Sequence, residues 1–270
     1  MRKRLMIIVA VVVVLLGGLA AVIVLSNRSN EPQQQAETDL APNLDQIEAK
    51  MDGGQYESAR QSLEQVVAED EANAEAHFML GLTYFNLEDY AKARESFQRA
   101  LELDPDRAAA IHHNLGALAY QTGDMETALS EFQAALESDP DDADTHYQLG
   151  ATYLVLAFPS GAMEPDSEMV AKAEAQFTRA LELADEKPEA RIGLANIHLV
   201  RGEMDEAISL LEGVLEDYPE MREALFALGR AYLTKGEMDK AEATLERFLE
   251  TDPPSIWAEQ AQTMLNQISP

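Results

Sequence analysis

The sequence predicts an all-α protein in which short pairs of helices repeat along the chain and pack side by side. Three observations carry this prediction. In residues 74–107, apolar side chains recur at spacings of three and four, which places an apolar stripe on each of two short helices. The same pattern returns with a period near 34 residues. The chain also begins with a long apolar run, which predicts one further helix of a different kind.

The two helices of residues 74–107 are expected to cross closely. Gly81 on the first helix and Ala93 on the second have almost no side chain, so the two backbones can approach each other. Pro105 ends the second helix, because proline cannot continue one. A helix pair of this size cannot bury its own apolar stripes. It therefore needs copies of itself on either side.

Copies of this pair follow along the chain. At intervals of 35, 34, 45 and 34 residues, the position of Gly81 is filled by Gly116, Gly150, Ala195 and Gly229. Leucine precedes the small residue each time, and the position of Ala93 is alanine in every copy. This order of leucine-small, tyrosine, alanine, aromatic and proline resembles the tetratricopeptide repeat, over about residues 40–254.

The resemblance implies a right-handed α-solenoid of about six helix pairs, with a concave groove that binds another protein. Its first repeat departs from the consensus pattern, as end repeats often do, because one side of an end repeat faces water. Residues 255–268 carry apolar residues at helical spacing and are expected to form a capping helix. The repeats are expected at residues 43–73, 74–107, 109–142, 143–187, 188–221 and 222–254.

The amino-terminal segment predicts a membrane anchor. Leu5 to Leu25 is an uncharged apolar run of 21 residues, and about 20 residues of helix span a bilayer. Three basic residues before the run outnumber Arg28 after it, so the positive-inside rule keeps the amino terminus in the cytoplasm. The repeats are then extracytoplasmic, in the periplasm of a bacterium. A cleaved signal peptide is the alternative, although its apolar region is normally shorter. Residues 26–42 form a flexible linker.

Charge restricts the partners. Residues 1–30 carry four basic side chains and no acid, whereas the remainder carries 16 basic against 49 acidic groups, a net charge of −33. Such a surface repels phosphate backbones, so we expect no nucleic acid and favour basic or apolar protein partners. Solubility alone, or adaptation to high salt, is the alternative reading of this charge.

Motifs for chemistry are absent from the sequence. It contains no cysteine, which excludes disulfides and thiolate catalysis. It contains no phosphate loop, nucleophile elbow or H-E-x-x-H motif either. The sequence therefore predicts neither an enzyme nor a cofactor.

Histidines and an acidic run are the candidate metal ligands in the sequence. His77, His112 and His146 occupy the same position in three repeats. One residue per helix, at a helix-packing distance of about 8–10 Å, gives no chelating pair, so packing is the preferred reading. A metal-binding protein using this row remains an alternative. The run 139–144 lacks the glycine and distal glutamate of an EF-hand, and is expected to cap the next helix.

One repeat is interrupted. Between Gly150 and Ala195 the interval exceeds the period by 11 residues, and the extra length falls around 158–168, where proline and glycine predict a loop. Insertions in solenoids are tolerated at the surface, so a neutral loop is one reading. A partner contact at the groove edge, with Phe158 and Met163 as apolar tips, is the other.

The predicted binding surface is the second stripe of each first helix, which by resemblance to the family lines the concave groove. Here it is largely apolar and aromatic. Packing between neighbouring first helices is the alternative role of these side chains. Family members that clamp the carboxylate tails of chaperones use lysine, asparagine and arginine at such positions, and this chain has only Asn196 and Arg230. That activity is therefore not carried over. The predicted groove residues are Phe78, Leu82, Phe85, His113, Tyr120, Tyr147, Leu154, Ile192, Asn196, Leu199, Phe226, Arg230 and Leu233.

The sequence thus predicts a non-enzymatic, membrane-anchored scaffold whose groove holds a protein or peptide outside the cytoplasm. A narrower alternative is an assembly factor of the cell envelope, similar to the anchored repeat proteins of cytochrome c maturation.

Overall fold

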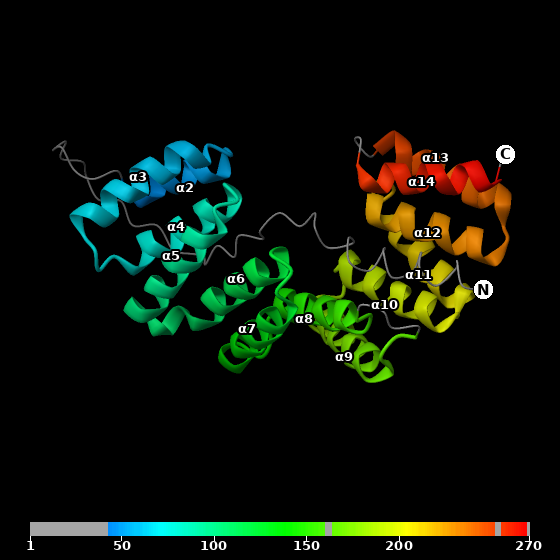
Figure 1. The fold of residues 1–270 in the computed structure, drawn as a ribbon, viewed down its shortest axis with the longest axis horizontal. Coiled ribbons are helices and arrows are strands. Elements are labelled where there is room, and N and C mark those ends of the chain that lie inside the picture. The colour runs from blue at the N-terminus through cyan, green and yellow to red at the C-terminus, as the bar shows by residue number, and fades with distance from the viewer. Residues whose placement is uncertain (1–42, 160–163, 252–254, 269–270) are drawn as a thin grey trace. The chain divides into compact units, whose positions relative to one another are not determined.

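The structure is a computed structural model that describes residues 43–159, 164–251 and 255–268 (Figure 1). Within these ranges the chain forms thirteen α-helices and one short 3-10 turn, with no strand. The predicted all-α class with stacked helix pairs is therefore confirmed. The described helices form two compact units. In the sequence, the boundary between the units falls between Asp141 and Asp142.

The amino-terminal unit contains three helix pairs. The two helices of each pair pack against each other, and successive pairs within the unit are in contact. Its apolar core runs from Ile47 on the first helix to Leu118 on the fifth. The 3-10 turn Pro105–Arg107 (η1) connects the second pair to the third. The helices are α2 (Leu44–Asp52), α3 (Tyr56–Glu69), α4 (Ala74–Asn86), α5 (Tyr90–Leu103), α6 (Ala108–Gln121) and α7 (Met125–Ser138).

The carboxy-terminal unit contains three further pairs and one single helix, α14 (Ile256–Ile268). This last helix packs against both helices of the final pair, so it covers the end of the stack. The pairs are α8 (Ala143–Leu156) with α9 (Ser167–Leu183), α10 (Pro188–Arg201) with α11 (Met204–Asp217), and α12 (Arg222–Lys235) with α13 (Met238–Thr251).

The predicted anchor, Leu5 to Leu25, and the linker 26–42 lie outside the described residues. Among the helices that the structure describes, none combines the length and the apolar character needed to cross a membrane.

Aspartate and asparagine side chains cap the amino termini of many of these helices. The side chain of Asn73 accepts a hydrogen bond from the Ala76 amide at 2.9 Å, at the start of α4. Asp142 accepts one from the Asp144 amide at 3.1 Å, at the start of α8. Such caps satisfy amides that have no partner inside the helix. The acidic run 139–144 therefore caps the next helix, as the sequence predicts.

A close crossing of the two helices defines each pair. A Cβ atom added to Gly116 on α6 would stand 2.7 Å from Cδ1 of Phe132 on α7. A Cβ atom at Gly150 would stand 2.9 Å from Phe177, and one at Gly229 would stand 2.7 Å from Leu245. Phe132 is fully buried, so its ring cannot move aside. The small residues of the repeat are therefore required by contact with a large side chain on the second helix.

Part of the insertion in the interrupted repeat is helical. The insertion lies between α8 and α9, as expected, and the Asp166 amide donates to the Ala157 carbonyl at 2.8 Å across its base. However, α9 begins at Ser167 and has 17 residues, whereas the second helices of the other pairs have 14. The last residues of the predicted loop 158–168 are therefore helical, and the added turn buries Val170. Phe158 is half-buried and Met163 lies outside the described residues.

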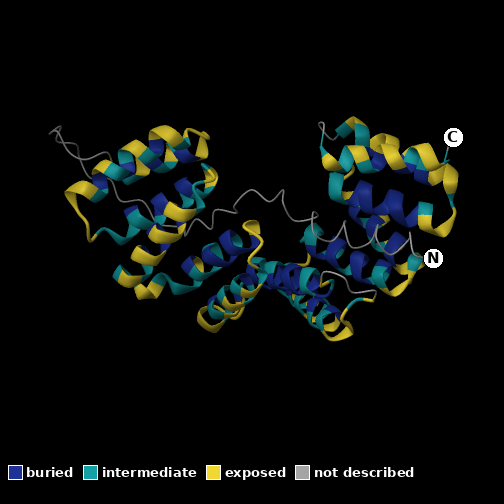
Figure 2. Ribbon diagram, viewed as in Figure 1, coloured by how far each residue is buried: buried dark blue, intermediate teal, exposed yellow. Residues whose placement is uncertain are grey.

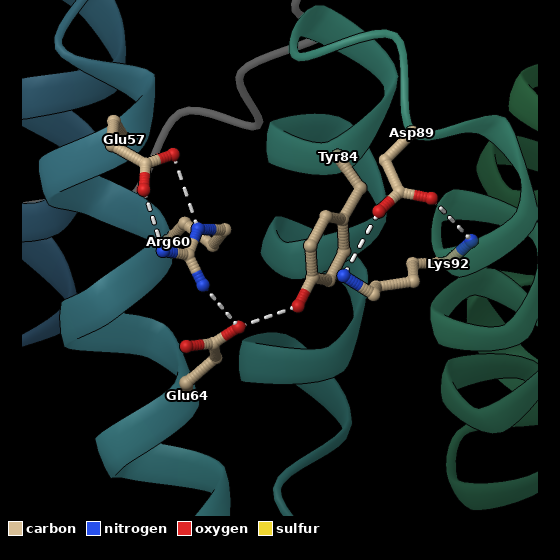
Figure 3. A network of polar contacts seen from close by, with 6 residues as sticks. All are labelled: Glu57, Arg60, Glu64, Tyr84, Asp89 and Lys92. Atoms are coloured by element: carbon tan, nitrogen blue, oxygen red, sulfur yellow. Dashed lines mark hydrogen bonds and ion pairs between the residues drawn. The ribbon is translucent and has the colours of Figure 1, made fainter.

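Adjacent pairs in the amino-terminal unit are also joined by a polar network (Figure 3). The Tyr84 hydroxyl on α4 donates to a carboxylate oxygen of Glu64 on α3 at 2.6 Å, and Arg60 donates to the same oxygen at 2.6 Å. The Lys92 ammonium lies 5.1 Å from the Tyr84 ring centroid. The hydrogen bond from Tyr84, with help from Arg60, holds the pKa of Glu64 below its usual range. Tyr232 and Glu212 make the equivalent bond in the carboxy-terminal unit.

We expect Gly116→Ala to destabilise the protein by about 1–3 kcal/mol, because the added methyl group overlaps the Phe132 ring and outweighs the better helix propensity of alanine. Gly213→Ala is the matched control. Gly213 lies inside α11 with no atom near its missing Cβ, so alanine there should stabilise by about 0.5–1 kcal/mol. Urea unfolding monitored by circular dichroism measures both. Equal effects of the two changes would contradict the close crossing.

The bond between Tyr84 and Glu64 should be visible in a double-mutant cycle of Tyr84→Phe and Glu64→Ala. Because the Glu64 side chain is 41% exposed, we expect a coupling of only about 0.5–1 kcal/mol at pH 7. A lowered carboxyl pKa contributes stability above the ordinary pKa of glutamate, and loses it as pH falls through the lowered value. The coupling should therefore decrease as the pH falls through this lowered pKa. A coupling that does not change with pH down to the acid limit of the folded protein would show that the carboxylate charge is not involved.

Candidate protein-binding face

The predicted groove residues lie on the first helices α4, α6, α8, α10 and α12, as their spacing requires. Residues separated by three or four positions share one face of a helix. We call this set of thirteen predicted groove residues the binding face. Figure 2 shows how burial varies along these helices, with α12 buried over most of its length.

In the amino-terminal unit the binding face is partly open to solvent. Phe78, Leu82 and Phe85 on α4 are half-buried, whereas Leu80 and Tyr84 on the same helix are buried in the core. The Phe78 ring centroid lies 5.9 Å from that of Phe97, and the Phe85 centroid lies 5.9 Å from that of Tyr90. Phe78 and Phe85 therefore pack against the core on one side and contact solvent on the other.

The third pair of this unit continues the same face on α6. His113 is half-buried, with its ring centroid 5.8 Å from that of Phe132. Tyr120 is buried, and its hydroxyl has no hydrogen-bond partner. Removal from water raises the pKa of the Tyr120 hydroxyl well above its usual range. This side chain stays protonated, so its hydroxyl retains a proton to donate.

In the carboxy-terminal unit most of the binding face is buried. Tyr147 is 4% exposed and Phe226 is 1% exposed. Phe226 is enclosed by Phe248, at 5.2 Å between centroids, and by Trp257 of α14, at 4.6 Å. Phe78 on α4 also contacts an aromatic ring of the following helix, so what distinguishes Phe226 is the second ring, Trp257, that α14 places against it. Also buried here are Leu154, Ile192 and Leu199, while Leu233 is half-buried.

The two polar members of the face, Asn196 on α10 and Arg230 on α12, are both buried. Arg230 is 8% exposed, and its Nη1 atom has no hydrogen-bond acceptor. Burial lowers the pKa of the Arg230 guanidinium to about 10, so the group is still a cation at neutral pH. Sequence reasoning identified the position but not the burial, because the spacing of residues along one helix does not report what packs over it.

The histidines of the row contact groups of their own repeat or of the preceding one. His112 Nδ1 lies 2.7 Å from a carboxylate oxygen of Glu131, and His146 Nδ1 lies 2.7 Å from the Gln176 amide oxygen. His77 contacts the Glu71 carbonyl at 3.2 Å. Across the ranges that the structure covers, no three histidine, aspartate or glutamate side chains gather as a metal site.

A shallow hollow lies off the binding face, between α5, α6 and α7. Sequence reasoning did not identify it, since its lining comes from three helices at unrelated repeat positions. It is lined by Arg94, Gln98, Leu115, Thr127 and Glu131.

The fold and the face together define a repeat protein of stacked helix pairs, whose candidate site is a surface of side chains rather than a set of reactive groups. Two family models described as tetratricopeptide repeat match the chain. One matches residues 44–108, 84–143 and 113–155, and the other matches residues 166–214 and 201–268. The chain belongs to the tetratricopeptide-repeat family.

Solved structures show the same fold. PilF of Pseudomonas aeruginosa is 19% identical, with 82% of this chain and 95% of that chain covered and a TM-score of 0.66. PilW, described as a widely conserved type IV pilus biogenesis factor, is 21% identical over 81% of this chain and 96% of its own, with a TM-score of 0.66. YrrB, described as a protein with an unusual peptide-binding site, is 23% identical over 74% of this chain and 97% of its own, with a TM-score of 0.52. A search of curated protein sequences found no match.

The open and closed parts of the face should respond differently to truncation. Phe85→Ala should cost at most about 1 kcal/mol of stability, because part of its side chain already contacts water. Phe226→Ala should cost about 3–5 kcal/mol, since it leaves a cavity between Phe248 and Trp257. Leu80→Ala, a buried core residue of α4, is the control for a cavity near the open part. Equal costs for Phe85 and Phe226, measured by urea unfolding, would contradict this division.

Proposed function

We propose that the chain is a non-enzymatic scaffold that holds an apolar or basic segment of another protein against its binding face. The observation that carries this proposal is the strip of half-buried apolar side chains on α4: Phe78, Leu82 and Phe85. Large apolar side chains that keep one side in water are common at protein interfaces, where aromatic residues contribute most of the binding energy. The peptide-binding site named for YrrB supports the same use of this fold.

The charge of the chain supports a protein partner over a nucleic acid. Beyond residue 30 the net charge is −33, so a partner with basic residues gains from the long-range field while a phosphate backbone is repelled. The face itself is mostly apolar. We therefore expect a partner segment with apolar anchors, in a protein whose surface is neutral or basic.

We further propose that residues 5–25 anchor the chain in a membrane, with the repeats on the extracytoplasmic side. The support is the uncharged run of 21 residues and the three basic residues that precede it. The similarity to PilW, a pilus biogenesis factor, favours the narrower alternative of an envelope assembly factor. Among the described residues no observation favours the metal-binding alternative, since the histidines contact groups of their own repeat or of the preceding one.

Crosslinking of the full-length chain in its native host, followed by copurification, tests the scaffold function. The double variant Phe78→Ala, Phe85→Ala should remain folded and lose at least tenfold of the copurified partner, because an aromatic anchor is worth about 2 kcal/mol or more of binding. Tyr218→Ala is the matched control, since Tyr218 is an exposed aromatic residue outside the binding face. Unchanged recovery of the partner by the double variant would refute the role of α4.

Protease protection tests the orientation. If the amino terminus is cytoplasmic, protease added to intact spheroplasts should digest the repeats, because the positive charges before the span hold that end inside. The measurement is an immunoblot against an epitope in the repeats, with a cytoplasmic protein as the control for intact cells. Full protection of the repeats would show the opposite orientation.

A further inference from the structure

A tyrosine ring lies between successive helix pairs at two places in the described chain, and each ring has the same neighbours. Its hydroxyl donates to a glutamate on the second helix of the preceding pair. A lysine ammonium on the second helix of its own pair lies 5.1 Å from the ring centroid in one place and 5.0 Å in the other. The two sets are Tyr84, Glu64 and Lys92, drawn in Figure 3, and Tyr232, Glu212 and Lys240.

The third helix pair lacks all three members of this set. Tyr84 follows Gly81 by three residues, and the residue that follows Gly116 by three is Ala119. Counted from the conserved alanine of the second helices, the positions of the glutamate and the lysine hold Gln98 and Thr127. The three changes agree with one another, because a charged acceptor and a cation have nothing to hold when the phenol is gone. This junction is therefore built without a ring of its own.

The hollow between α5, α6 and α7 lies at this junction. Its volume is about 190 Å³, and a cavity of roughly 150 Å³ is large enough to hold benzene. Ala119 is fully buried, so the walls have closed over its methyl group, and the hollow is the part of the vacated space that stays open. Three of its lining residues, Arg94, Gln98 and Thr127, occupy the repeat positions of Arg60, Glu64 and Lys92, which surround Tyr84 in Figure 3.

Resting on the proposed scaffold function, we propose that this hollow receives the side chain of a tyrosine from the bound partner. The chain's own tyrosines show that the place between two pairs fits a phenol. The ring must come from another molecule, because residues 1–42, 160–163, 252–254 and 269–270 contain no aromatic side chain. The hollow gives the scaffold a second contact point, outside the binding face and in the same unit as the strip on α4.

The shape of the hollow favours a side chain over a free small molecule. Pockets for small ligands usually exceed about 300 Å³ and enclose most of the ligand. This hollow is smaller, and Arg94 and Gln98 on its wall are exposed. A ring bound here keeps one edge in water, so it is held weakly unless the backbone that carries it is bound elsewhere on the protein.

The lining also selects among aromatic side chains. Leu115 supplies an apolar wall, and the Gln98 amide oxygen can accept the hydrogen bond that a glutamate accepts at the other two places. The Arg94 guanidinium is a cation of the kind that stacks on aromatic faces. Phenylalanine leaves the polar wall without a partner, and phosphotyrosine is repelled by the Glu131 carboxylate.

The first test is binding of a tyrosine side chain to the full-length chain. N-acetyltyrosinamide should raise the melting temperature in a saturable manner, with a dissociation constant of roughly millimolar order. N-acetylphenylalaninamide should bind about threefold to tenfold more weakly, because it lacks the hydroxyl. N-acetylleucinamide should give no saturable response. No response to the tyrosine probe, or an equal response to the phenylalanine or leucine probe, would refute a tyrosine site.

Variants of the hollow locate the binding. Ala119→Tyr adds the missing ring from inside and should abolish the response to N-acetyltyrosinamide. Gln121→Tyr is the matched control, because it adds the same ring at an exposed position of the same helix, and it should respond as the wild type does. A response retained by folded Ala119→Tyr would overturn the proposal.

Gln98→Leu is the second variant, in case the buried position of Ala119 prevents folding of Ala119→Tyr. Gln98 is exposed, so this change leaves the fold intact and removes only the acceptor. The tyrosine probe should then bind no better than the phenylalanine probe. An unchanged preference for tyrosine would show that the hydroxyl is not recognised in this hollow.

Copurification separates this inference from the scaffold function. Ala119→Tyr and Gln98→Leu should each lose at least threefold of the crosslinked partner, while Gln121→Tyr keeps it. If both retain the partner and the Phe78→Ala, Phe85→Ala variant loses it, the scaffold function stands and the partner's tyrosine is refuted, whether or not the free probe binds. If no variant changes recovery, both proposals fail.

Discussion

The contact between a residue without a side chain on one helix and a large side chain on its partner is the constraint on which the rest of the structure depends. At Gly116 the ring of Phe132 fills the place where a Cβ atom would stand. This contact draws the two helices of a pair together and fixes how they cross. The remaining apolar stripes then face outward, toward the neighbouring pairs. A single pair cannot bury them, so stacking follows from the crossing itself.

Stacking also determines which parts of the binding face are open. A first helix presents the same positions in every repeat, but the helix beside it differs. Phe78 on α4 keeps one side in water, whereas Phe226, at the same repeat position on α12, is closed by Trp257 of α14. The same repeat position is thus a contact surface in one place and core in another. The half-buried strip on α4 is therefore the stronger basis for the scaffold function.

Local chemistry explains what could be predicted from the sequence. The helix pairs follow from spacings of three and four, and the cap at Asp142 follows from its place before an apolar run. The extra turn of α9 was missed, because Pro165 and the nearby glycine indicate a loop without showing where it ends. The closure of Phe226 and the orphaned Nη1 of Arg230 depend on residues that are distant in sequence or on partners that are missing. The periodicity of residues along one helix reports neither the distant residues nor the missing partners.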